Sequence, residues 1–369
     1  MQSNAIHIML LGATGYTGRL IAQLLHENGF EFHAFGRSLE KLQGLKEQNP
    51  SCLEIGVLDL EALSLLGINA NSLIINCVGP FNVYAAPIVQ ACVEAGAMYI
   101  DITGEQEIVR QSFGLVANKS RENNALVVHS MAFESAMSDL LLVKSKNEMP
   151  ADTYKSFNTY YLLNSKQMSP GTRITMKVAN AFPTYTLHQG EILPQESLSP
   201  TENPDPIAPM KGLKVGYPEP ILAKAHGDVR SAQAHFLVEP TDDMAFLWSN
   251  KPTSTMGQTQ IDSVIARHNN TNFSGPTHEE RQLQTFEIHT YLQTDEAIKF
   301  HRLLGRDMYG LTAELVVLSV QYIVQQISQF NNRKGICGVQ TPGQFLRAFG
   351  QSWLLNHPHL MLESKQIIP

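Results

Sequence analysis

The feature that most constrains this chain is a glycine-rich turn near its N-terminus, Gly12-Ala-Thr-Gly15-Tyr-Thr-Gly18. The turn follows the uncharged apolar run 5–11 and precedes residues 17–28, whose apolar positions recur at helical spacing. A buried strand, a G-x-x-G-x-x-G turn and a helix, in this order, can hold a dinucleotide pyrophosphate at the helix N-terminus. We therefore expect a dinucleotide to bind at Gly12, Ala13, Thr14, Gly15, Tyr16, Thr17 and Gly18.

The alternation of strand and helix continues through the first 139 residues. Helical patterns such as 87–96 separate further apolar runs, and these strand-like runs occupy 30–36, 52–58, 72–79, 97–104 and 125–130. Strands that alternate with helices predict an α/β fold with a Rossmann-type, doubly wound parallel sheet.

The pattern changes after Asp139. Apolar and polar residues alternate in 172–180, 234–240 and 283–293, which predicts strands that are half exposed to water. Seven of the 19 prolines lie between Pro194 and Pro220, so we expect a long loop there, either a lid or an insertion. Residues 306–330 have the pattern of one long amphipathic helix.

Composition excludes several classes of protein. The net charge of −7 argues against a nucleic-acid partner and against a basic membrane-binding face. The four cysteines, Cys52, Cys77, Cys92 and Cys337, lack the number and spacing of a disulfide framework or a zinc site. We find no signal-peptide pattern and no run of about 20 apolar residues, so we expect a cytoplasmic protein without an integral membrane segment. The pairs His357/His359 and His278/Glu279 are isolated, and we expect no metal site.

The end of the second predicted strand indicates which dinucleotide binds. NAD sites place an acidic residue there to bind the ribose 2′-hydroxyl, whereas this chain reads Phe35-Gly36-Arg37-Ser38. Arg37 could pair with a 2′-phosphate, with Ser38 as a further donor and Lys41 adding charge one turn later, which predicts NADP. Asp59, after the third strand, either faces the adenine or caps a helix.

Several segments together resemble a known family, the saccharopine dehydrogenase-like oxidoreductases, which include saccharopine reductases and trans-acting enoyl reductases. The N-terminal segments are GATGYTG (12–18), GRSLEKL (36–42), NCVGPF (76–81), PIVQAC (87–92) and YIDITGE (99–105). Residues 129–135 resemble the family's next element, with Ala132 in place of Gly and Glu134 in place of Asp. Near the C-terminus, 305–313 and 338–342 resemble its D-P-x-Y-G-x-T-A and G-G-V-x-T-P elements.

The resemblance implies a division into three parts. Residues 1–139 would form the dinucleotide-binding domain, and 140–304 an α+β domain for substrate or oligomer contacts. Residues 305–369 would form a helical segment packed back on the first domain. The family also implies a homodimer. Val78, Gly79 and Pro80 would lie along the cofactor, and Tyr84 and the Asp101–Glu105 loop would border the reacting centre. We include Cys77 with the cofactor residues, although a thiol there also suits a small buried position.

A nicotinamide supplies a hydride, so the protein must orient the substrate and handle a proton. Tyr84 and Glu105 are our catalytic candidates, and Asp101, His129 and Glu134 are further candidates by position. Two of these acids have an alternative structural role, because Asp101 suits a turn cap and Glu105 suits the start of a helix. Arg173, in a Ser-Pro-Gly-Thr-Arg segment that resembles a turn facing the family's active site, is a candidate substrate anchor.

We therefore expect an NADP-dependent reductase of a C=C or C=N bond, acting on a small-molecule or carrier-bound substrate. Arginines in the middle of the chain are too scattered for saccharopine itself, and a polyamine-forming reductase would require an acidic pocket. A short-chain dehydrogenase is excluded because no tyrosine has a lysine four residues later. A semialdehyde dehydrogenase is disfavoured because Cys77 lies too early to be its nucleophile. The alternative is a non-catalytic NADP-binding sensor or scaffold.

Overall fold

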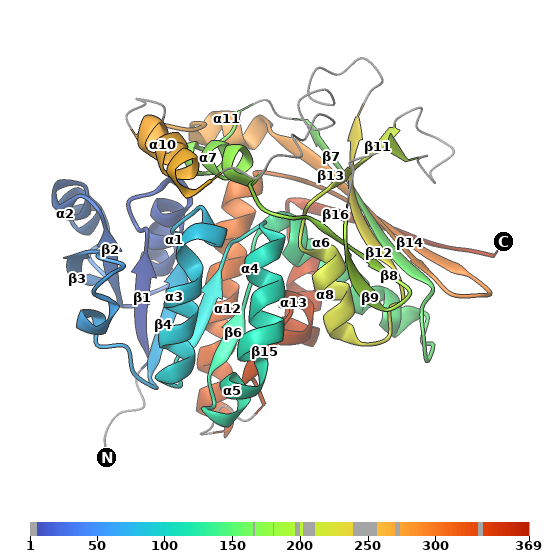
Figure 1. Cartoon of the computed structure of the whole chain (residues 1–369), viewed down its shortest axis with the longest axis horizontal. Coiled ribbons are helices and arrows are strands. Elements are labelled where there is room, and N and C mark those ends of the chain that lie inside the picture. Colours follow the sequence, from blue (N-terminus) through green and yellow to red (C-terminus); the bar gives the residue numbers. More distant parts are fainter. Residues whose placement is uncertain are drawn as a thin grey trace.

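Two sheets joined by a layer of helices make up the computed structural model of the chain (Figure 1). The residues that it describes are 6–164, 167–179, 181–195, 200–201, 211–238, 257–269, 274–330 and 335–368.

The first sheet contains seven parallel strands in the order β15-β6-β5-β4-β1-β2-β3. These are β1 (His7–Leu11), β2 (Phe32–Gly36), β3 (Cys52–Val57), β4 (Ser72–Asn76), β5 (Met98–Asp101), β6 (Leu126–Val128) and β15 (Gly338–Gln340). From β1 the chain adds β2 and β3 on one side, and then returns to add β4, β5 and β6 on the other side. The boundary between β1 and β4 is therefore the topological switch point of a Rossmann fold. The predicted doubly wound sheet is therefore confirmed.

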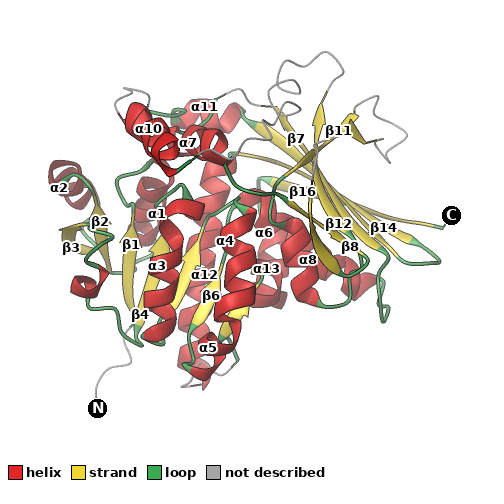
Figure 2. Cartoon of the chain, in the orientation of Figure 1, coloured by secondary structure: helices red, strands yellow, loops and turns green. Residues whose placement is uncertain are grey.

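Helices cover both faces of this sheet, which explains the uninterrupted apolar runs of its strands (Figure 2). In β1, Ile8 and Leu10 pack in the core that contains α1 (Tyr16–Glu27) and α12 (Met308–Phe330), whereas Met9 and Leu11 pack in the core that contains α3 (Phe81–Glu94). The helices of this part are α1 (Tyr16–Glu27), α2 (Leu39–Gln48), α3 (Phe81–Glu94), α4 (Gln106–Gln111), α5 (Ala117–Glu122) and α6 (Phe133–Glu148), with a 3-10 turn at Leu63–Leu66 and a π-helical turn at Ser112–Val116.

The second sheet is mixed, with the order β10-β11-β12-β7-β13-β14-β16 and with β8 and β9 attached at β12. Its strands are β7 (Ser156–Asn164), β8 (Tyr185–His188), β9 (Glu191–Pro194), β10 (Pro200–Thr201), β11 (Lys211–Val215), β12 (Ala232–Val238), β13 (Thr285–Gln293), β14 (Ile298–Arg306) and β16 (Leu360–Ile367). One face packs against α6, α8 (Glu219–His226) and α13 (Pro342–Asn356), so that Tyr161, Phe286 and Leu303 join the core of the first sheet.

The C-terminal segment contributes to both sheets. Helix α12 (Met308–Phe330) packs on α1, β15 extends the first sheet beside β6, and β16 extends the second beside β14. The expected return of the C-terminal helices onto the first domain is confirmed. Helix α6 continues through residue 139, where we expected the first domain to end.

Two expectations about the middle of the chain are wrong. Residues 172–180 do not form a strand, because Pro170–Ala179 is helix α7. Ile174 and Val178 lie one turn apart and both pack in the cluster that contains Ile261 and Ile265 of α10 (Gln258–Asn269), so alternation concealed a helical i, i+4 pair.

The proline-rich segment 194–220 is not simply a loop, because its described part includes β10, β11 and the start of α8. Pro200 lies in the outermost strand of the sheet, where a missing N–H is tolerated. Residues 196–199 and 202–210, almost half of the predicted lid, lie outside the described residues.

In the part of the chain that the structure describes, one helical stretch, Met308–Gln329 of α12, is long and apolar enough to cross a membrane. In its most apolar window, 61% of the residues are buried inside the protein. Because α12 packs against α1, α6 and α13, this stretch is a core helix and not a membrane span.

Candidate cofactor and active site

The glycine-rich turn forms a tight cradle at the carboxyl end of β1. Gly12 has φ +76°, and a Cβ there would lie 2.9 Å from the Cys77 carbonyl. A Cβ on Gly18 would lie 2.3 Å from the Gly12 oxygen, so α1 approaches the turn too closely for any side chain. Gly15 is exposed at the N-cap of α1, and the first N–H groups of that helix have no partner within it. This arrangement fits a pyrophosphate.

The side chains of the cradle have other roles. Ala13 is fully buried, Thr14 lies against Gly36 of β2, and Thr17 is half-buried. The Tyr16 hydroxyl donates to the Pro276 carbonyl at 2.6 Å, and its ring meets Tyr309 edge-on with centroids 4.9 Å apart. Tyr16 therefore connects the glycine turn to the segment that precedes α11 (His278–Leu283) and to the start of α12.

The residues expected to select NADP lie at the end of β2 and the start of α2. Arg37 is exposed directly after Gly36, and the Ser38 hydroxyl accepts the Lys41 N–H at 3.3 Å as the N-cap of α2. The Lys41 side chain is exposed. Asp59 is also exposed and accepts the Glu61 N–H at 2.9 Å in a turn.

The loop after β4 faces the glycine turn across the switch point. Its Val78 N–H donates to the Asn76 side chain at 2.9 Å, and Pro80 is the N-cap of α3. Gly79 is exposed, and a Cβ there would lie 3.5 Å from the Thr175 hydroxyl of α7. Cys77 packs on the core, where burial raises the pKa of its thiol. Helix α7 therefore lies over the edge where a cofactor would cross.

Tyr84 of α3 packs against α7 and α10, in the cluster that contains Val178 and Ile261. Burial raises the pKa of its hydroxyl, whereas the charge of Arg37 lowers it. Tyr84 therefore lies close to the basic end of β2.

Arg173 lies in the first turn of α7 and is half-buried. Two contacts show how α7 is oriented. Thr172 contacts the Tyr309 hydroxyl at 3.1 Å, and Thr175 contacts Glu105 at 3.5 Å. Residues two apart on a helix are rotated by about 200° from each other. Arg173 and Thr175 therefore lie on nearly opposite sides of α7.

Glu105 caps a helix from a distance. Its two carboxylate oxygens accept the N–H groups of Phe81 at 2.7 Å and Asn82 at 2.9 Å, which begin α3. Burial raises its pKa to about 7, while these two donors favour the ionised form. The contacts also explain why α3 begins at Phe81, six residues before the helix that we predicted at 87–96.

Asp101 and His129 belong to a buried hydrogen-bond network under the loop. His129 Nδ1 lies 2.6 Å from Asp101 Oδ2, and His129 Nε2 lies 2.8 Å from the Ser112 hydroxyl. Asp101 also accepts the Tyr99 hydroxyl at 2.9 Å and the Ser130 N–H at 2.9 Å. All of these side chains are buried, so the network supports the loop after β5 and does not face solvent.

Two glutamates that have no cationic partner among the described residues lie beside this loop. Glu134 is in the first turn of α6, and a Cβ on Gly104 would lie 3.4 Å from its Oε1. Glu219, in the first turn of α8, accepts the Tyr161 hydroxyl at 2.6 Å and the Ser135 hydroxyl at 2.9 Å. Its other oxygen is buried without a partner in the same part of the chain. Burial raises both pKa values to about 7, and the charge of Glu219 further raises that of Glu134.

Tyrosines surround this carboxylate pair. Tyr217 is half-buried, and burial followed by the charges of Glu134 and Glu219 raises its pKa well above 10.0. The Tyr309 hydroxyl accepts the Ser169 N–H at 2.8 Å at the start of α7. Glu219, Tyr217 and Tyr161 are absent from the predicted site, because they come from the middle of the chain and no motif marks them.

Comparisons with known proteins show what the N-terminal part of the chain resembles. Residues 8–139 match the family described as the saccharopine dehydrogenase NADP binding domain. A mouse saccharopine dehydrogenase-like oxidoreductase is 30% identical over 167 residues, which cover 40% of this chain and 39% of that protein. A trans-acting enoyl reductase of Mycobacterium bovis is 32% identical over 140 residues, which cover 36% of this chain and 34% of that protein. The matches therefore span less than two fifths of these relatives.

A solved structure extends the likeness to the whole fold. Saccharopine dehydrogenase (L-Glu forming) from Saccharomyces cerevisiae aligns over 98% of this chain and 100% of its own, with a TM-score of 0.59 and 11% sequence identity. At this identity the likeness shows a shared fold. Residues 8–139 of this chain are therefore similar to the saccharopine dehydrogenase NADP binding domain, and the chain as a whole shares the two-domain fold of saccharopine dehydrogenase.

Proposed function

We propose that the protein is an NADPH-dependent reductase of a C=N bond. The observation that carries this proposal is the pair formed by half-buried Glu134 and buried Glu219, which lies beside the loop after β5 without a cationic partner in the described part of the chain. Ligands of doubly wound folds bind at this carboxyl edge of the sheet, near the switch point.

Preference for NADPH is supported by the residues after β2. The position that would hold a carboxylate in an NAD site is occupied by Gly36-Arg37-Ser38, and Arg37 is exposed at the end of the strand. Arg37 would bind the 2′-phosphate, and the N-terminus of α1 would bind the pyrophosphate. NADPH supplies a hydride when bound.

The glutamate pair can both hold a cation and handle a proton. Two close carboxyl groups titrate as a unit and share a proton near neutral pH. The ionised partner stabilises a positively charged iminium carbon–nitrogen group, and the protonated partner supplies a proton at the same site. Glu134 is the partly exposed member and is our candidate for contact with substrate.

The pair favours C=N over C=C reduction. Reduction of an enoyl thioester develops negative charge on the carbonyl oxygen, which adjacent carboxylates would oppose. An iminium ion carries positive charge, which they stabilise. The pair supplies the acidic groups that an amine-binding reductase requires.

The test is NADPH oxidation at 340 nm with two probes, Δ1-piperideine as an imine and crotonyl-N-acetylcysteamine as an enoyl thioester. We expect turnover of the imine, with kcat lowered at least 100-fold in Glu134→Gln and with NADPH affinity unchanged. Glu363→Gln, on the exposed strand β16, is the matched control.

The outcomes separate the alternatives. Turnover of the thioester alone would replace C=N by C=C reduction. Imine turnover that survives Glu134→Gln would remove the glutamate from the mechanism. Tight NADPH binding without turnover of either probe would favour the non-catalytic NADP-binding protein.

A further inference from the structure

A hollow of the protein surface lies against β15, the edge strand of the first sheet. Its volume is about 570 Å³, and none of the cofactor or glutamate residues described above lines it. Strands β6, β5 and β4 separate β15 from β1. At about 4.8 Å per strand, the edge strand is roughly 19 Å from the strand that carries the glycine turn. The hollow is therefore distinct from the cofactor site.

The charge of this hollow is opposite to that of the whole chain. Arg121, Lys146, His226 and Arg347 line it, and no aspartate or glutamate of the described residues does, although the chain has a net charge of −7. Lys146 pairs with Asp228 at 2.6 Å, and His226 pairs with Asp139 at 2.8 Å. The two guanidinium groups have no such acidic partner in the part of the chain that the structure describes.

Both arginines are held by local structure. The stem of Arg121 lies across Gly338 of β15, where a Cβ would approach its Cγ to 3.2 Å. Arg347 interrupts α13 with φ +47° and ψ −132°, and its Nε donates to the Gln344 carbonyl at 3.0 Å. Backbone conformations this unfavourable for a residue with a side chain concentrate at functional sites.

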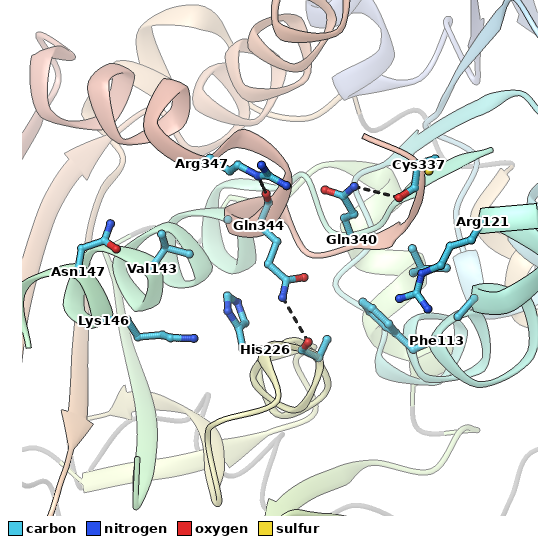
Figure 3. A pocket seen from close by; sticks show the side chains of 14 residues that line it. Phe113, Arg121, Val143, Lys146, Asn147, His226, Cys337, Gln340, Gln344 and Arg347 are labelled. Carbon is cyan, nitrogen blue, oxygen red and sulfur yellow. Dashed lines mark hydrogen bonds between the residues drawn. The ribbon is translucent and has the colours of Figure 1, made fainter. Parts of the chain in front are cut away.

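The side chains converge on the hollow from different elements (Figure 3). Lys146 of α6 and Arg121 of α5 reach in from opposite sides, with His226 and Gln344 between them. Phe113, Val143 and Val339 add apolar wall. The volume of about 570 Å³ is within the range of small-molecule sites.

We propose that this hollow binds a small organic anion. Its phosphoryl or carboxylate group would be bound by the guanidinium groups of Arg121 and Arg347, which can form charge-assisted, bidentate hydrogen bonds. Its apolar part would lie on Phe113, Val143 and Val339.

The test is isothermal titration calorimetry of the full chain with phenyl phosphate, benzoate and inorganic phosphate. Phenyl phosphate and benzoate distinguish a phosphate ester from a carboxylate, and inorganic phosphate lacks the apolar part. We expect at least one of the two aromatic anions to bind more tightly than inorganic phosphate, and to bind at least 10-fold more weakly to Arg121→Glu.

Two further variants complete the design. Arg306→Glu makes the same change of charge at the exposed end of β14, and we expect it to bind as the wild type does. Arg347→Gly removes the second guanidinium with a residue that adopts a positive φ readily, so it tests the site even where Arg121→Glu fails to fold. Binding that is equal in wild type, Arg121→Glu and Arg347→Gly, or no binding of either aromatic anion at 10 mM, would overturn the proposal.

Discussion

Arg37 is the residue on which the choice of dinucleotide depends. A charge-assisted hydrogen bond contributes about 1.5–3 kcal/mol, which corresponds to roughly 10- to 100-fold in affinity. We expect Arg37→Ala to weaken NADPH binding by that factor, toward the affinity for NADH, in calorimetric titrations with both cofactors. Arg306→Ala, at the far end of β14, is the control. Equal binding of the two cofactors that does not depend on Arg37 would contradict the NADP preference.

The raised pKa of Glu219 makes the stability of the protein depend on pH. Burial raises its pKa from an ordinary value of 4.5 to about 7, so the folded state holds this proton more tightly than the unfolded state. Between pH 4.5 and pH 7 the native state binds more protons, so its contribution to stability falls as pH rises through this window. The shift corresponds to an upper limit of about 3 kcal/mol.

We therefore expect Glu219→Gln to leave stability nearly unchanged at pH 5 and to raise the free energy of unfolding by about 1–3 kcal/mol at pH 8. The glutamine oxygen can still accept the hydroxyls of Tyr161 and Ser135. Urea unfolding at the two pH values measures the difference. A variant that is less stable than wild type at pH 8 would show that the carboxylate is ionised and stabilising there.

The residues that could be predicted from sequence are those of the local fingerprint. Gly12, Gly15 and Gly18 lie together because a single turn carries them, and Arg37 lies one strand away at the same edge. Glu219 could not be predicted, because its partner Glu134 is 85 positions earlier and the two meet only when α8 packs on α6.

At the scale of elements, α3 depends on a carboxylate from another segment. Glu105 accepts the first two N–H groups of this helix and is buried. Glu105→Gln keeps one acceptor and places an amide N–H against the other donor. We expect a loss of about 1–2 kcal/mol in the free energy of unfolding, measured in urea, with kcat changed by less than threefold.

The same variant tests our expectation of a catalytic Glu105. If Glu105→Gln lowers kcat about 100-fold and leaves stability unchanged, the carboxylate has a catalytic role and the capping account is wrong. Glu94→Gln removes a carboxylate from the exposed end of the same helix, so it is the matched control.

Elements that are marked by an apolar pattern in their own residues could be predicted, whereas elements that are defined by tertiary packing could not. Strand β1 and helix α1 follow from their own apolar patterns. Helix α7 has the sequence pattern of a strand, because Ile174, Met176 and Val178 occupy every second position. Ile174 and Val178 are also four positions apart, so the same residues fit the helical repeat. The Ser169-Pro170 start of α7, a helix N-cap followed by proline at the first position, was the available signal.

At the scale of the whole molecule, the C-terminal segment joins the two sheets. Strand β15 completes the first sheet and β16 the second, while α12 and α13 pack between them. No local pattern predicts that the three-residue strand Gly338–Gln340 pairs with β6, more than 200 residues earlier. The family resemblance indicated the return of this segment, and the topology shows what it completes.

We therefore expect the first 139 residues to depend on the last 65 for their fold. Ile21, Ala22 and Leu25 of α1 are fully buried in the core that contains α12. Removal of α12 exposes this apolar face, and removal of β15 leaves the β6 edge unpaired. We expect a fragment of residues 1–139 to lack a cooperative urea transition and a near-ultraviolet dichroism spectrum, whereas the full chain shows both. A fragment that unfolds cooperatively and binds NADPH as tightly as the full chain would show that residues 1–139 fold as an independent domain.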